Sequence, residues 1–182
     1  FNEATMGFTT NSNFQWGIYI NRGWSNPHLI TYQESHDEER LMYKNLTYGN
    51  SNGGYDIKSL NTALKRNEMA AAFWAMIPGP KMMWQFGELG YDKSINLCED
   101  GVTINNNCRL SPKPVLWNYQ SNTNRAALYN VYSKLFALRK HAPYLPAFTT
   151  NNIEYNLSAG FKSLKVTSVP LKIVVVGNFD VV

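Results

Sequence analysis

Charged side chains are scarce in this chain, and those present do not gather into runs of one sign. Among 182 residues, 17 are Lys or Arg and 13 are Asp or Glu, which gives a net charge of +4. A protein that follows a phosphate backbone needs clustered cations, so the composition argues against a nucleic acid partner. No apolar run approaches about eighteen residues, and we therefore expect no membrane span.

Cysteine is equally rare, with only Cys98 and Cys108 present. The segment between them is rich in Asp, Gly and Asn, which favour turns and let the chain fold back on itself. We therefore predict a disulfide rather than two free thiols, and with it an oxidising location: secreted, periplasmic or cell-surface. No CxxC pair or nearby histidine supports zinc, and we assign no metal ligand. Asp100 and the Asn run leave calcium open, although their spacing is not that of an EF-hand.

The segment most informative about function is residues 29–40, LITYQESHDEER. In it a short apolar strand is followed directly by several carboxylates around one histidine. Parallel strands of α/β barrels present catalytic side chains in this way, at their C-terminal ends. A second strand, residues 81–86, ends in Gly87-Glu88. A helix capped by Ser59 lies between them and stops at Pro78-Gly79-Pro80, so the order is strand, helix, strand.

The rest of the chain changes character near residue 147. A second helix, capped by Asn122 or Thr123, is predicted up to Pro143 from its apolar residues at helical spacing. Three β-type runs follow, at residues 153–157, 161–168 and 172–179. We therefore predict two parts, residues 1–146 and residues 147–182.

Taken together, these features resemble the last quarter of an α-amylase family glycoside hydrolase. The resemblance covers about residues 29–144 and rests on four elements: His36-Asp37 after an apolar strand, Pro78-Gly79-Pro80, Gly87-Glu88, and the helix closing on Ala137-Leu138-Arg139-Lys140. It implies an α/β fold, namely the last βαβα portion of a TIM (β/α)8 barrel, with residues 147–182 starting an antiparallel β-rich domain. In this family the nucleophilic Asp and the acid/base Glu lie on earlier strands. The resemblance therefore implies a C-terminal fragment that is inactive alone.

The same resemblance implies roles for individual residues. Asp37 matches the family's third essential carboxylate, which stabilises the transition state and holds sugar hydroxyls, and His36 would bind the same sugar. The alternative is that this pair only satisfies backbone groups at a strand end. Glu88 is assigned a supporting role in the architecture of the site. Glu38 and Arg40 are also given supporting roles, in which they would line acceptor subsites. The alternatives are that these charged residues are only solvated, or that Arg40 neutralises the carboxylates.

The implied parent enzyme is a retaining glycosidase acting on α-1,4 linkages of starch- or glycogen-type α-glucans. Two alternatives stay open: a branching enzyme or other transglycosidase, because Ser35 stands where many amylases carry Asn, and a non-catalytic glucan-binding homologue. No cofactor is predicted, with calcium left open for the parent. Two barrel strands alone would leave a parallel sheet edge unpaired, so we expect the chain to self-associate. The alternative is that the β-rich tail folds across the exposed face.

Overall fold

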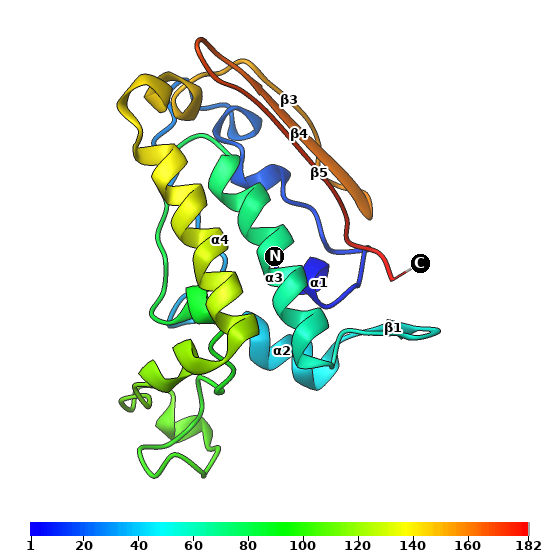
Figure 1. The fold of residues 1–182 in the computed structure, drawn as a ribbon, viewed down its shortest axis with the longest axis vertical. Coiled ribbons are helices and arrows are strands. Elements are labelled where there is room, and N and C mark those ends of the chain that lie inside the picture. Colours follow the sequence, from blue (N-terminus) through cyan, green and yellow to red (C-terminus); the bar gives the residue numbers. More distant parts are fainter. Residues whose placement is uncertain (182) are drawn as a thin grey trace.

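Two long helices lie side by side at the centre of the molecule, with a three-stranded sheet beyond one of them (Figure 1). The computed structural model describes residues 1–181 and combines helices with two small antiparallel sheets in a mixed α/β arrangement. The long helices are α3 (Leu60–Met76) and α4 (Thr123–Lys140), and the sheet contains β3 (Ile153–Asn156), β4 (Phe161–Thr167) and β5 (Lys172–Asn178). Shorter elements are α1 (Asn2–Thr5), α2 (Leu41–Tyr48), the hairpin β1 (Ser51–Asn52) and β2 (Tyr55–Asp56), and the 3-10 turns η1 (Gln15–Gly17), η2 (Tyr19–Arg22), η3 (Gly87–Leu89), η4 (Asn106–Cys108), η5 (Trp117–Ser121) and η6 (Ala142–Phe148).

Both long helices begin and end where local sequence signals place them. Ser59 occupies the N-cap position of α3 with extended backbone, and the helix stops before Pro78, which disfavours helical backbone in the preceding residue. At α4 the Asn122 side-chain oxygen accepts hydrogen bonds from two free backbone N–H groups, so it caps the helix. The predicted helices and the three predicted antiparallel strands are therefore confirmed.

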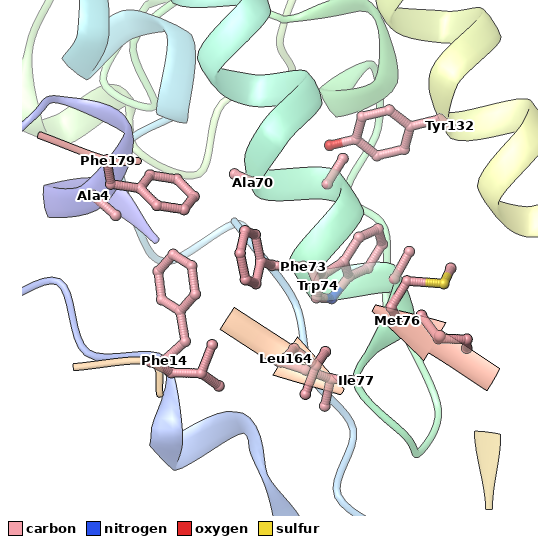
Figure 2. Close-up of a cluster of buried hydrophobic side chains, with 14 of the residues drawn as sticks. Ala4, Phe14, Ala70, Phe73, Trp74, Met76, Ile77, Tyr132, Leu164 and Phe179 are labelled. Atoms are coloured by element: carbon pink, nitrogen blue, oxygen red, sulfur yellow. The ribbon is translucent and has the colours of Figure 1, made fainter. Parts of the chain in front are cut away.

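Aromatic side chains of α3 connect α4 to the sheet (Figure 2). The ring of Trp74 lies 6.0 Å from that of Tyr132 on α4, whereas Phe73 faces Phe179, just after β5, at 5.6 Å. Leu164 of β4 belongs to the same buried cluster. Residues on both sides of position 147 thus share one core, and the division into 1–146 and 147–182 stays a prediction.

The two predicted parallel strands are reduced to a single bridge between Thr31 and Lys81. The N–H of Thr31 donates to the Pro80 carbonyl at 3.1 Å, and the N–H of Met82 donates to the Thr31 carbonyl at 3.0 Å. Within residues 1–181 there is no closed barrel. Parallel strands are normally stabilised by neighbours on both sides and by covered faces, and here each segment pairs with the other alone.

Candidate functional site

The segment that links the parallel bridge to α2 turns His36 and Asp37 toward solvent. Ser35 is buried, and its hydroxyl accepts the Asp37 N–H at 3.1 Å while donating to the Glu38 carboxylate. The side chains of His36 and Asp37 are 62% and 68% exposed. Ser35 and Glu38 therefore close a tight turn, and the two side chains between them, those of His36 and Asp37, point outward.

Two side chains from distant parts of the chain approach the His36-Asp37 pair: Trp84 lies beside His36, and Arg109 beside Asp37. His36 Nε2 lies 3.5 Å from Asp37 Oδ2, and the His36 ring stands 5.5 Å from the ring of Trp84. Arg109 Nη2 is 3.6 Å from Asp37 Oδ1 and also donates to the main-chain carbonyl of Asp37. Arg109 was not predicted from the sequence, where its only signal is its position immediately after Cys108.

A cleft of about 370 Å³ opens beside this group. Apolar faces and polar side chains both line it, from the His36 segment and from the segment between η3 and α4, which projects at the bottom of Figure 1. The lining residues are His36, Arg40, Trp84, Gln85, Tyr91, Lys93, Ser94, Ile95, Arg109, Leu110, Ser111, Pro112 and Lys113. Aromatic faces combined with hydrogen-bonding groups suit a sugar ring and its hydroxyls.

Glu39 fastens this projecting segment to the site. Its carboxylate accepts hydrogen bonds from the Ser94 hydroxyl and the Ile95 N–H, both at 2.7 Å. Both oxygens of Glu39 are thereby engaged, and this carboxylate acts as a structural anchor.

Arg40 lies inside the protein, where it neutralises Glu34. Arg40 Nη2 is 2.8 Å from Glu34 Oε1 and donates to the Gln85 carbonyl, while the guanidinium faces the Tyr91 ring at 4.7 Å. Burial raises the pKa of Glu34, and Arg40 beside it opposes that rise. Arg40 also lines the cleft, so both roles considered for it stay predictions.

Glu88 is not brought into the cleft. It lies in η3 and lines a separate depression with Tyr129 and Tyr132 of α4. Its Oε2 is buried without a hydrogen-bond partner, and burial raises the pKa of Glu88, with Glu34 adding to that rise. Glu88 therefore does not line the cleft of His36, and its supporting role stays a prediction.

Cys98 and Cys108 form the predicted disulfide, with their Cα atoms 4.9 Å apart. Lys113 reinforces the closure, because its ammonium donates to the carbonyls of Leu97 and Cys108 at 2.8 and 2.6 Å. Inside this loop the Asp100 carboxylate accepts the N–H groups of Val102 and Thr103. Across residues 1–181, no group of three or more His, Cys, Asp or Glu side chains is placed to hold a metal ion.

The helices of the described residues are too short or too polar to cross a membrane. No protein-family model and no curated protein gives a significant match to this chain.

Proposed function

We propose that this chain forms the sugar-holding part of the active site of an α-amylase-type retaining glycosidase that acts on α-glucans. The observation that carries the proposal is the exposed Asp37 carboxylate, which lies 3.5 Å from His36 and 3.6 Å from Arg109. His36 and Arg109 line the cleft together with Trp84, whereas Asp37 stands beside the cleft and does not line it. The resemblance of the surrounding motifs supplies the substrate class. In this proposal the enzyme is secreted, periplasmic or cell-surface, a location with which the disulfide agrees.

The proposed chemistry needs a negative charge that touches the sugar and is not consumed elsewhere. Glycoside hydrolysis develops positive charge on the sugar ring, and a fixed carboxylate stabilises that charge more than it stabilises the ground state. Asp37 meets this need because its side chain is 68% exposed, so that a sugar can reach the carboxylate although Arg109 forms an ion pair with it at 3.6 Å. His36 would donate to a hydroxyl of the same sugar, and Trp84 would stack on its face.

The neighbouring carboxylates are committed to the protein itself. Glu34 is buried against Arg40, Glu38 accepts from Ser35, and Glu39 holds the projecting segment. A retaining mechanism needs a nucleophile and an acid/base about 5–5.5 Å apart. In the proposal both come from a barrel segment outside residues 1–182, so this chain alone should not hydrolyse starch.

Non-catalytic glucan binding is the second candidate, favoured by the same shortage of uncommitted carboxylates around Asp37. Transglycosylation gains no support from Ser35, whose hydroxyl is occupied within its own turn. Product analysis on amylose with the complete barrel separates the three functions. Shorter maltooligosaccharides indicate hydrolysis, new branch points indicate transglycosylation, and unchanged amylose indicates binding alone.

The binding part of the proposal is testable on this chain with maltoheptaose. Titration followed by nuclear magnetic resonance should give saturable shifts of residues lining the cleft, and Asp37→Asn and Trp84→Ala should weaken the affinity by about tenfold or more. Glu154→Gln is the matched control, because it removes an exposed carboxylate paired with Lys165 on the sheet. Equal affinities in all variants, or no binding to the unaltered chain, would contradict the proposal.

A further inference from the structure

We propose that Arg109 is a positioning residue for Asp37, and that the Cys98–Cys108 disulfide holds Arg109 in place. The proposal rests on the function proposed above only in treating Asp37 as the sugar-binding carboxylate. Arg109 contacts Asp37 twice, through the main-chain carbonyl and through the carboxylate. One guanidinium thus restrains both the backbone and the charge of the same residue.

The contacts form a closed ring around the cleft. The projecting segment leaves the site at Ile95, whose N–H is held by Glu39. It returns at Arg109, which is held on Asp37, two residues before Glu39 in the chain. The disulfide joins the outgoing and returning arms between these two anchors. Both ends of the loop are therefore fastened to one short stretch, residues 37–39.

The covalent link is needed because the polar contacts of Arg109 are exposed. The side chains of Arg109 and Asp37 are 43% and 68% exposed, and solvent-exposed ion pairs are weak. Arg109 directly follows Cys108, so the disulfide limits how far its backbone can move from the outgoing arm. Lys113 bridges the same two arms through the carbonyls of Leu97 and Cys108. It therefore restrains the returning arm on the C-terminal side of Arg109.

The position of Arg109 also sets the shape of the cleft. Leu110, Ser111 and Pro112 follow it in the chain, and all three line the cleft together with His36 and Trp84. A displaced Arg109 would therefore disturb the Asp37 carboxylate and the adjoining wall together. Sugar binding should depend on a loop that lies far from Asp37 in the sequence.

The experiment follows the Asp37 amide and side-chain carboxyl resonances of the complete chain. Arg109→Ala should shift both and increase the mobility of the Asp37 amide, while core amides such as that of Leu164 stay in place. Arg109→Lys should give a smaller shift, because an ammonium keeps the charge but loses the planar fork. The paired substitution Cys98→Ser with Cys108→Ser should move the same Asp37 signals with Arg109 still present.

Arg22→Ala is the matched control, since Arg22 is an exposed arginine that donates to the Trp16 carbonyl at 2.7 Å. It should leave Asp37 unchanged. Unaltered Asp37 resonances in Arg109→Ala, or in the cysteine pair, would overturn the proposal. If Arg109→Ala does not fold, Arg109→Lys and the cysteine pair provide the same readout.

A maltoheptaose titration separates this proposal from the proposed function. We expect Arg109→Ala and the cysteine pair each to weaken affinity by about tenfold, the effect of losing one hydrogen bond to a charged group. If the unaltered chain does not bind maltoheptaose but Asp37 still responds to Arg109, the glycosidase proposal fails and the positioning role stands. If maltoheptaose binds equally well to all variants, the positioning role has no functional consequence and is rejected.

Discussion

The guanidinium of Arg125 on α4 lies 2.7 Å from the carboxylate of Asp92, in the segment that leads to the cleft. The same group donates to the main-chain carbonyls of Leu89 and Gly90 and faces the ring of Tyr119 at 3.9 Å. Tyr119 in turn donates to Asp92 at 2.5 Å. A single buried arginine therefore fastens the base of the projecting segment to the helical layer.

This arrangement predicts a large loss of stability in Arg125→Met. The substitution leaves Asp92 with only the more distant Lys93, at 3.8 Å, as a cation, and it leaves two carbonyls without the Arg125 donor. Removing one partner of a buried pair costs about 3 kcal/mol or more. Urea unfolding should show the loss as a lower midpoint. The exposed arginine in Arg22→Met should change the free energy of unfolding by less than about 0.5 kcal/mol. Equal midpoints for the two variants would contradict the prediction.

A second prediction concerns pH and the partly buried Lys81. Burial, with Arg139 nearby, lowers the pKa of Lys81 from 10.5 to about 6. Between these values the unfolded chain binds a proton that the folded chain does not, so this group makes stability rise with pH. The Lys81→Met substitution should therefore increase the free energy of unfolding most near pH 6, relative to the unaltered protein. This increase should become smaller toward pH 10.

Urea unfolding of both proteins at pH 6, 8 and 10 measures that difference. Lys134→Met provides the control, because Lys134 is an exposed lysine on α4. Its effect should be the same at all three pH values. A difference for Lys81→Met that does not change with pH would exclude a lowered pKa for this lysine.

Glu88 leads to a third prediction with the opposite dependence on pH. Its folded pKa is raised above 4.5 by burial, so above pH 4.5 the folded chain retains a proton that the unfolded chain has lost. Stability contributed by this group is thus lost as the pH rises through that window. Glu88→Gln should raise the thermal midpoint at pH 7 and have little effect near pH 4. Glu99→Gln, at an exposed loop position, is the control and should not show this pH dependence. If Glu88→Gln raised the thermal midpoint equally at pH 4 and pH 7, the prediction of a raised pKa for Glu88 would be wrong.

The fourth prediction is that the chain self-associates through the unpaired side of the parallel bridge. Trp16, Ile30 and Tyr32 are exposed there and line one depression. Apolar groups gathered beside an unpaired strand favour association with a second copy. Light scattering over a dilution series should show a mass that rises with concentration.

Ile30→Lys should lower that mass, whereas Val102→Lys, at an exposed apolar position in the disulfide loop, should not. A constant monomer mass for the unaltered chain at every concentration would refute self-association.

The same samples, incubated with starch, should release no reducing sugar, and measurable turnover would show that the reacting carboxylates lie within this chain.

Local signals were sufficient for the elements whose stabilising contacts are close in sequence. The Asn122 cap, the proline stops and the 3.6-residue apolar spacing define α3 and α4, because capping and side-chain burial act within each helix. The antiparallel strands β3, β4 and β5 pair with their neighbours in the chain, so alternating residues and turns predict them. The disulfide was predictable for the same reason, since a short, turn-rich loop separates Cys98 from Cys108.

Tertiary structure alone decided the rest. Residues 29–33 and 81–86 have strand-like composition, but a parallel strand requires neighbours, and the chain provides one bridge between them. Whether a carboxylate faces solvent or the protein was equally beyond the sequence: Asp37 is exposed, while Glu34 and Glu39 are engaged by Arg40 and Ile95. Arg109 reaches Asp37 from 72 positions away, a contact without a local pattern. The sequence determined which groups were available for chemistry, and the packing of distant segments determined which of them meet, because hydrogen bonds and ion pairs depend on distance in space and not along the chain.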